Sequence, residues 1–209
     1  MTIDLSVYFV TDTKLCGERG VLATVEAAVR GGASVVQLRD KQASARELLA
    51  LAVDLLGALK GTGIPLLIND RLDVALAAGA DGVHLGQSDL DVENARRLAG
   101  PHFLIGLSVS RAPDIEEVHA LPAGTVDYLG IGPVFPTTTK QDAQAALGLD
   151  AVAALRNCTD LPCVGIGGIN RHNAPSVWAT GLDGLAVVSA ICAALDPAAA
   201  AAALRNGRP

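Results

Sequence analysis

The sequence predicts an α/β protein in which eight parallel strands, each followed by a helix, close into a (β/α)8 TIM barrel. Short apolar and β-branched runs alternate with longer Ala- and Leu-rich helical patterns along the whole chain. A glycine follows a helix and precedes the next strand in three places, 32–36, 79–83 and 181–185, which indicates a repeated strand–helix unit. Because the 209 residues contain no linker, we expect residues 1–209 to form one domain.

Eight runs have the length and composition of buried strands. They are residues 8–11, 34–38, 65–69, 82–85, 103–108, 128–131, 163–166 and 184–188. Apolar residues at three- and four-residue spacing predict helices at 46–60, 91–98 and 150–157, and an Ala-rich run predicts a terminal helix at 198–203. Since such barrels typically contain roughly 250 residues, the loops here must be short.

The main alternative is an open, doubly wound sheet that binds a nucleotide. That fold is expected to carry Gly-x-Gly-x-x-Gly between its first strand and the following helix. Residues 11–17, Thr-Asp-Thr-Lys-Leu-Cys-Gly, do not match this motif. The pattern therefore favours the closed barrel.

Composition and charge argue against several classes of function. A formal net charge of −6 and an aromatic content of 3% disfavour broad binding to nucleic acid or to anionic membranes. No apolar stretch is long enough to span a bilayer and the first residues lack a signal peptide, so we expect a soluble, cytoplasmic protein. The four cysteines show no C-x-x-C spacing and are expected to be buried, reduced thiols.

A cluster of charge follows the second predicted strand. In residues 35–41, Val-Val-Gln-Leu-Arg-Asp-Lys, the side chains of Gln37, Arg39 and Lys41 would point to one face if the strand continues that far. Two cations and an amide on one face can bind a phosphate or pyrophosphate. The alternative is a solvated strand end, which is the usual setting of a short charged run. The positions of the other polar residues favour the anion site.

Polar and glycine-rich groups recur where nearly every predicted strand ends, which is where TIM-barrel enzymes build their active sites. Asp70 and Asp89 follow adjacent strands, and they fit a Mg²⁺ ion held by few carboxylates together with water and phosphate oxygens. Asp70 has an alternative role as the N-cap of a helix over 71–78. Asp73 is the competing carboxylate, but it lies inside that helix and should point elsewhere.

A polar stretch follows the sixth predicted strand and reaches residue 148. Its hydroxyls, backbone N–H groups and one lysine suit an anion, and such a stretch can close as a lid. The alternative is an ordinary surface loop. The residues concerned are Thr137, Thr138, Thr139 and Lys140.

Gly167 and Gly168 follow the seventh predicted strand, and a helix is expected to start at Ser189 after the eighth. Phosphate commonly binds in this part of a TIM barrel, where glycine lets the backbone approach closely and a helix start offers N–H groups. His84 lies within a strand, and we expect it to be a hydrogen-bonded core residue rather than a catalyst.

Five stretches together resemble the thiamine phosphate synthase family. They are VQLRDK at 36–41, INDR at 68–71, GVHLGQSD at 82–89, the segment from GP to TTTK at 132–140, and IGGI at 166–169. The resemblance covers residues 8–191. It implies a barrel enzyme that uses Mg²⁺ to join hydroxymethylpyrimidine pyrophosphate to a thiazole phosphate, releasing pyrophosphate, and CO₂ when the thiazole is carboxylated. The partners would be these small molecules, and a homo-oligomer is a further expectation.

The resemblance also implies roles for individual residues. The expected catalytic residues are Arg39, Lys41, Ser108 and Lys140. The set expected to bind the pyrimidine pyrophosphate is Gln37, Leu38, Arg39, Asp40, Lys41, Asn69, Ser108 and Lys140. The set expected to bind the thiazole phosphate is Thr137, Thr138, Thr139, Gly168, Val188 and Ser189, and the expected Mg²⁺ ligands are Asp70 and Asp89.

One residue departs from the family pattern. In Gly-Leu-Ser-Val-Ser at 106–110, the family usually has His where this chain has Ser110. Two rival functions stay open. One is a related thiazole tautomerase, which would not need a full pyrophosphate site, and the other is a non-catalytic sensor of a phosphorylated thiamine precursor. The charged residues at 39, 41, 70, 89 and 140 favour the synthase over both.

Overall fold

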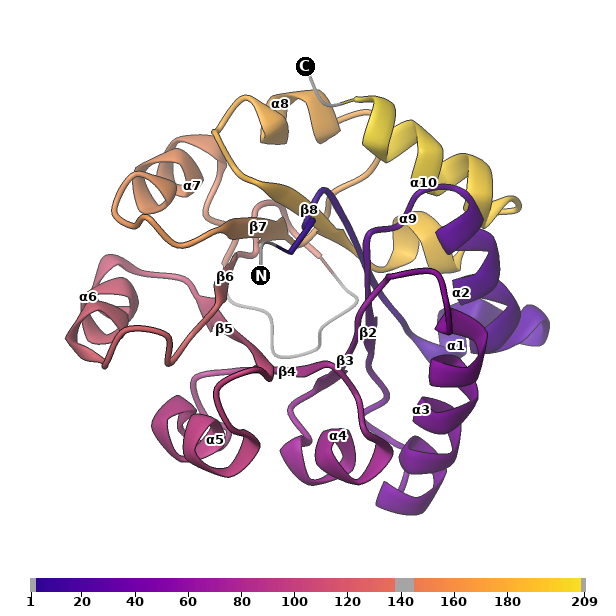
Figure 1. Cartoon of the computed structure of the whole chain (residues 1–209). Coiled ribbons are helices and arrows are strands. Elements are labelled where there is room, and N and C mark those ends of the chain that lie inside the picture. Colours follow the sequence, from indigo (N-terminus) through magenta and orange to yellow (C-terminus); the bar gives the residue numbers. More distant parts are fainter. Residues whose placement is uncertain (1–2, 138–144, 208–209) are drawn as a thin grey trace.

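The structure is a computed structural model that describes residues 3–137 and 145–207, and it confirms the predicted fold class. Eight parallel strands pair in chain order, and the last pairs with the first to close the barrel (Figure 1). The strands are β1 Val7–Val10, β2 Val35–Leu38, β3 Leu66–Asn69, β4 Gly82–Leu85, β5 Leu104–Val109, β6 Tyr128–Ile131, β7 Cys163–Ile166 and β8 Gly184–Val187. Each predicted strand matches an observed one to within one residue at either end.

The helices form a ring around the strands (Figure 1). They are α1 Thr13–Cys16, a 3₁₀ turn η1 Gly17–Arg19, α2 Gly20–Arg30, α3 Ala45–Leu59, α4 Leu72–Ala78, α5 Val92–Ala99, α6 Ala112–Ala120, α7 Leu149–Arg156, α8 Ala174–Trp178, α9 Ser189–Cys192 and α10 Pro197–Asn206. The four helices predicted from spacing and composition are confirmed as α3, α5, α7 and α10. The helix expected to start at Ser189 is confirmed as α9, whereas the four residues of α1 are too few to give a periodic signal.

Alternation along each strand divides the buried side chains into two layers. In β1, Val7 and Phe9 pack against the helices, whereas Tyr8 and Val10 point into the barrel. The lower part of the interior is filled by apolar side chains that include Val35. Its upper part, at the carboxyl ends of the strands, is left for a cavity that Tyr8 and Val10 help to line.

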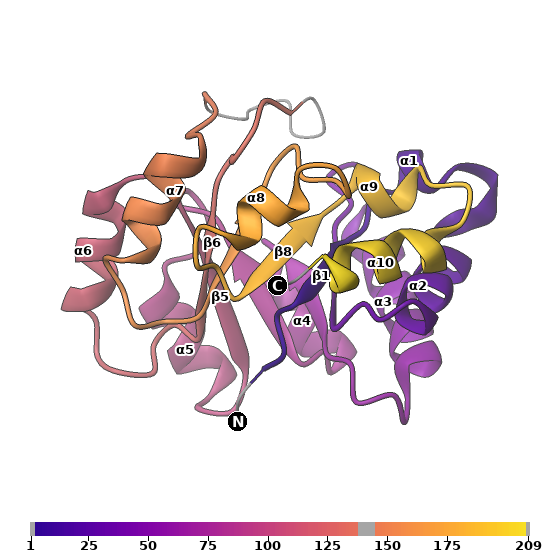
Figure 2. The ribbon, with the colours of Figure 1, turned by 90° about the horizontal axis from the view of Figure 1, so that it is seen from above.

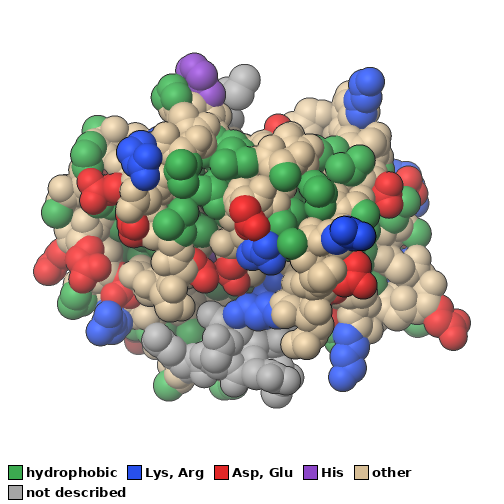
Figure 3. Space-filling model, turned by 90° about the horizontal axis from the view of Figure 1, so that it is seen from below, with side chains coloured by type: hydrophobic (Ala, Val, Ile, Leu, Met, Phe, Trp, Pro, Cys, Tyr) green, Lys and Arg blue, Asp and Glu red, His purple; other side chains and the backbone are tan. Residues whose placement is uncertain are grey.

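The two ends of the barrel differ in what they carry. Figure 2 views the barrel from the side, with the N-terminus at the amino end of the strands and α1 and α9 at the carboxyl end. Seen from the side on which α4 and α5 lie, hydrophobic side chains are gathered between charged ones (Figure 3). Leu76, Leu90 and Leu98 are exposed and line a shallow hollow with a volume of about 370 Å³ on this side.

The expectation of buried thiols is correct for three cysteines and wrong for the fourth. Cys16, Cys163 and Cys192 are buried, whereas Cys158 is exposed just beyond the end of α7. All four are free thiols, as predicted. Across residues 3–137 and 145–207, no helix has both the length and the apolar character needed to cross a membrane.

Candidate active site

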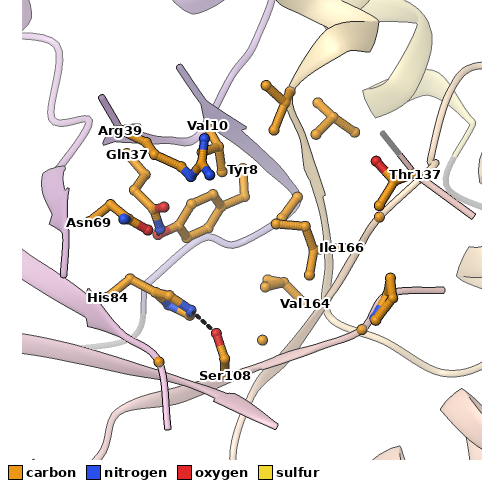
Figure 4. A pocket seen from close by; sticks show the side chains of 18 of the residues that line it. Tyr8, Val10, Gln37, Arg39, Asn69, His84, Ser108, Thr137, Val164 and Ile166 are labelled. Carbon is orange, nitrogen blue, oxygen red and sulfur yellow. Dashed lines mark hydrogen bonds between the residues drawn. The ribbon is translucent and has the colours of Figure 1, made fainter. Parts of the chain in front are cut away.

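A cavity of about 500 Å³ opens at the carboxyl ends of the strands. Eleven of the residues predicted to form the site line it: Gln37, Arg39, Lys41, Asn69, Asp70, Asp89, Ser108, Thr137, Gly168, Val188 and Ser189. They come from seven different strands or the loops after them, so the closed barrel is what brings them together (Figure 4). Thr138, Thr139 and Lys140 lie outside the described residues.

Leu38 and Asp40 were included in the predicted site but do not line the cavity. Leu38 is fully buried on the opposite face of β2, in the layer that packs against the helices, because side chains alternate along a strand. The carboxylate of Asp40 accepts hydrogen bonds from the backbone N–H groups of Gln42 (2.9 Å) and Ala43 (3.1 Å). It therefore shapes the turn that precedes α3.

The cation cluster faces the cavity although β2 ends one residue before Arg39. The hydroxyl of Thr11 accepts a hydrogen bond from the Arg39 backbone N–H at 3.0 Å, and this contact keeps the chain extended beyond the strand. The Arg39 guanidinium lies 3.9 Å from the carboxylate of Asp12, and the Lys41 ammonium lies 3.9 Å from that of Asp70. The Arg39 side chain is 15% exposed and that of Lys41 is 44% exposed, and both line the cavity, so the anion site stays a prediction.

Asp70 and Asp89 face each other across the loops after β3 and β4. Asp70 has a φ of +61°, a strained value for a residue other than glycine, and its N–H donates to the His84 carbonyl at 2.9 Å. Asp89 accepts a hydrogen bond from the N–H of Gly86 at 2.7 Å. Burial raises the pKa of Asp70 to about 6, aided by a hydrogen bond to Asp89 and by its charge, whereas the nearby Lys41 lowers this pKa.

The two alternatives for the carboxylates are resolved by their contacts. α4 begins at Leu72, and its N-cap is Arg71 with no capping side chain, so Asp70 is not a helix cap. Asp73 is exposed and forms an ion pair of 2.6 Å with Arg71, away from the cavity. Within the part of the chain that the structure describes, no cluster of three or more His, Cys, Asp or Glu side chains is suited to hold a metal.

The opposite side of the cavity, from β6 to β8, combines apolar side chains with a glycine-rich backbone. Gly168 has a φ of +66°, and a Cβ placed on it would lie 2.7 Å from the Cβ of Phe135 and 2.8 Å from the carbonyl oxygen of Pro136. Its own carbonyl accepts a hydrogen bond from the Asn173 side chain at 2.9 Å. Ser189 follows β8 and begins α9. Only glycine fits at position 168 unless Phe135 and Pro136 move.

Sequence reasoning did not assign several residues that line the cavity, above all Tyr8, His84 and Ser110. His84 was expected to be a core residue with satisfied hydrogen bonds. Its ring nitrogens are indeed paired, with Tyr128 and Ser108, both at 2.9 Å, but the ring also lines the cavity. The register of β4 could have indicated this, because His84 lies on the inward face of a barrel strand two residues after Gly82.

Fold and cavity together define a class: a (β/α)8-barrel enzyme whose site is suited to phosphorylated small molecules. The family model described as thiamine monophosphate synthase matches residues 7–191, so the chain belongs to this family. The thiamine-phosphate synthase of Azorhizobium caulinodans is 52% identical over 203 residues, covering 97% of this chain and 94% of that relative. The one from Laribacter hongkongensis is 54% identical over 198 residues, covering 94% and 92%.

Solved structures agree with this assignment. Thiamine phosphate pyrophosphorylase from Pyrococcus furiosus superposes with a TM-score of 0.88 at 38% identity, covering 98% of this chain and 96% of that one. A 3-hexulose-6-phosphate synthase superposes with a TM-score of 0.71 at 18% identity, which shows a shared fold alone. The predicted family is thus confirmed, and the chain is a transferase.

Proposed function

We propose that this protein is a thiamine phosphate synthase that transfers the hydroxymethylpyrimidine group from its pyrophosphate to the nitrogen of a thiazole phosphate. The products are thiamine phosphate and pyrophosphate, with CO₂ when the thiazole is carboxylated. The family and the names of the relatives support the reaction. The observation that carries it is one cavity with cations and carboxylates on one side and a glycine-lined backbone on the other.

The residues on the charged side fit a magnesium ion. Asp70 and Asp89 are close enough for their charges to interact, and their proximity is unfavourable unless a proton or a cation lies between them. Two carboxylates with water and phosphate oxygens are a common arrangement for this ion. When bound there, Mg²⁺ would neutralise charge on the leaving pyrophosphate. The ion and its ligands stay a prediction.

The chain's own residues then have distinct tasks. Arg39 and Lys41 stabilise the negative charge that develops as the bond between the pyrimidine methylene carbon and the pyrophosphate oxygen breaks. The electron pair of that bond leaves with the oxygen, and the lone pair of the thiazole nitrogen forms the new bond to the methylene carbon. Lys140, outside the described residues, is proposed to assist Arg39 and Lys41.

Water must be kept from the electron-poor methylene carbon, because it would intercept the reaction. Val164 and Ile166 provide an apolar wall on the side opposite Arg39 (Figure 4). The lid predicted in the segment up to residue 148 lies partly outside the described residues and stays a proposal. A cytoplasmic location and a homo-oligomeric state are likewise expectations.

The test is to mix the purified protein with hydroxymethylpyrimidine pyrophosphate, thiazole phosphate and Mg²⁺, and to measure pyrophosphate and thiamine phosphate. We expect both products, with release of pyrophosphate dependent on the thiazole. Isomerisation of the thiazole without coupling would instead indicate the tautomerase. Tight binding of either precursor without any product would indicate the sensor.

A further inference from the structure

A continuous chain of hydrogen bonds crosses the barrel interior, and four of its five residues line the cavity. The Gln37 amide donates to the Tyr8 hydroxyl at 2.7 Å, and this hydroxyl lies 2.7 Å from that of Tyr128. The Tyr128 hydroxyl lies 2.9 Å from Nδ1 of His84, whose Nε2 lies 2.9 Å from Oγ of Ser108. The contact between His84 and Ser108 is drawn in Figure 4. Five strands therefore contribute to one chain.

Two glycines leave room in the barrel for the rings that form these hydrogen bonds. A Cβ at Gly106 would overlap the Tyr128 ring, and one at Gly130 would lie 3.0 Å from Cε1 of His84. Both glycines thus provide the space that the two rings occupy. The Tyr8 and Tyr128 rings are tilted by 46° with their centroids 5.8 Å apart, and both residues are buried. Burial raises the pKa of Tyr8 and of Tyr128, so each hydroxyl keeps its single proton.

The donor at one end sets the direction of every bond that follows. The Tyr8 oxygen accepts from Gln37, so the Tyr8 proton is available for the Tyr128 oxygen. In that direction the Tyr128 proton would be donated to Nδ1 of His84, which would leave Nε2 as the protonated nitrogen. Nε2–H would then donate to Oγ of Ser108. In the reverse direction the Tyr8 proton would have no acceptor within the chain.

We propose that Tyr8, Tyr128 and His84 are positioning residues that make Ser108 a hydrogen-bond donor toward the cavity. Because Oγ of Ser108 already accepts from His84, its own proton points to an acceptor on the bound ligand. The ligand class is a heteroaromatic ring with an unprotonated ring nitrogen. This proposal rests on the proposed function only in that the pyrimidine would be that ring. Ser108 is then not a nucleophile or base activated by histidine, because His84 presents it with an N–H.

The first measurement is the tautomer of His84 in the protein without ligand. The ¹⁵N chemical shifts of the imidazole in histidine-labelled protein distinguish a protonated from an unprotonated ring nitrogen. We expect a neutral ring with Nε2 protonated and Nδ1 unprotonated. A ring protonated on Nδ1 would overturn the proposal, because Ser108 would then donate to His84. This measurement does not depend on turnover. It therefore tests the direction of the hydrogen bonds separately from the proposed function.

Two tyrosine variants test the direction of the chain. Tyr128→Phe keeps the ring and removes the donor to Nδ1, so we expect a mixture of the two tautomers. Tyr8→Phe cuts the link to Gln37, so the Tyr128 hydroxyl can either donate to Nδ1 or accept from it, and the same mixture should appear. If either variant leaves the tautomer of His84 unchanged, the hydrogen bonds do not act as proposed.

Kinetics then connect the tautomer to the ligand. Tyr128→Phe is expected to raise KM for the pyrimidine pyrophosphate roughly tenfold, the effect of one hydrogen bond, while KM for the thiazole phosphate stays constant. The control is Thr125→Val, which removes a buried hydroxyl that donates to the Pro122 carbonyl, outside the cavity. Equal changes in both KM values, or the same change in the control, would show that these hydrogen bonds serve only to stabilise the fold. If the Tyr128→Phe variant does not fold, the tautomer of His84 in the wild-type protein still tests the proposal.

Discussion

The two sides of the cavity are proposed to hold anions by different physical means. On the side of β2 to β4, charged side chains such as Arg39, Lys41 and Asp70 reach in from loops. On the side of β6 to β8, the contribution comes from glycine backbone and the start of α9. Point charges suit a pyrophosphate that must leave with a metal, whereas N–H groups suit a phosphate that only needs to be held. Removing a charged side chain should therefore impair catalysis at the charged side. At the backbone side, adding a side chain to a glycine should weaken substrate binding.

The largest effect is expected from removing a carboxylate on the charged side. Asp70→Ala deletes a predicted metal ligand and the carboxylate that lies 3.9 Å from the Lys41 ammonium, so kcat/KM for coupling should fall by roughly 10³-fold or more. Lys140→Ala should have an effect of the same order. The measurement is pyrophosphate release at saturating Mg²⁺.

A matched control is close in sequence. Asp73→Ala removes an exposed carboxylate whose partner is Arg71, and we expect full coupling activity. Circular dichroism of both variants checks that the barrel is intact. Activity like that of the wild type in Asp70→Ala would remove this residue from the mechanism.

The backbone side should respond to a single added methyl group. In Gly168→Ala the new Cβ meets Phe135 and Pro136 at a positive φ, so the loop after β7 must shift. We expect KM for the thiazole phosphate to rise by roughly tenfold or more, with a much smaller change for the pyrimidine pyrophosphate. Steady-state kinetics with each substrate varied in turn give both values.

Gly181→Ala separates backbone strain from crowding. Gly181 has a similar positive φ of +83°, but a Cβ there meets only the Arg156 side chain at 4.0 Å. It should lower the melting temperature without changing either KM. An equal rise of both KM values in Gly168→Ala would show that the two sides of the cavity are not independent.

The dependence of stability on pH should also distinguish the two sides, because Asp70 on the charged side has a shifted pKa. The pKa of Asp70 is raised to about 6, above the value of about 3.9 expected in the unfolded chain. A raised carboxyl pKa means that the folded state binds the proton more tightly. Its contribution to stability is therefore complete below the unfolded pKa and is lost as the pH rises through about 6.

Asp70→Asn removes this titration and the predicted metal site together. Without Mg²⁺, the variant should gain melting temperature relative to the wild type between pH 5 and pH 8. Adding Mg²⁺ at pH 8 should stabilise the wild type by mass action and leave the variant unchanged. Thermal unfolding at the two pH values, with and without the ion, tests this. A variant that responds to Mg²⁺ as the wild type does would place the ion elsewhere.

Sequence alone predicted the strands to within one residue because each is a short apolar run between helices with clear periodicity. It located the cavity because a parallel barrel brings all carboxyl ends to one rim. It was wrong to place the side chains of Leu38 and Asp40 in the cavity because they belong to the same motif as Arg39. Alternation along β2 directs Leu38 toward the helices, and Asp40 binds the backbone of the turn before α3. The interior chain through Tyr8 and Tyr128 links residues 120 positions apart, which no local pattern reveals.

The smallest effect is expected at Ser110, where the family pattern has His. Its hydroxyl donates to the Asp114 carboxylate at 3.3 Å, the longest of the hydrogen bonds that this carboxylate accepts. Asp114 also accepts from the Ser110 N–H at 2.9 Å and from the Arg111 guanidinium at 2.8 Å, so the start of α6 should survive the loss of the hydroxyl. Ser110→His should therefore keep kcat/KM within about threefold of the wild type.

Ser110→Ala measures what the hydroxyl alone contributes, and comparison of the two variants isolates the effect of the added ring. Ser110 lines the charged side of the cavity beside Ser108, so an imidazole there would lie near the proposed position of the pyrimidine. If alanine is tolerated and histidine reduces kcat/KM by more than about thirtyfold, the loss of about 2 kcal/mol cannot come from the missing hydroxyl. This side of the cavity would then have been reshaped around serine, and the charged side would depend on the volume of its residues as well as on their charge.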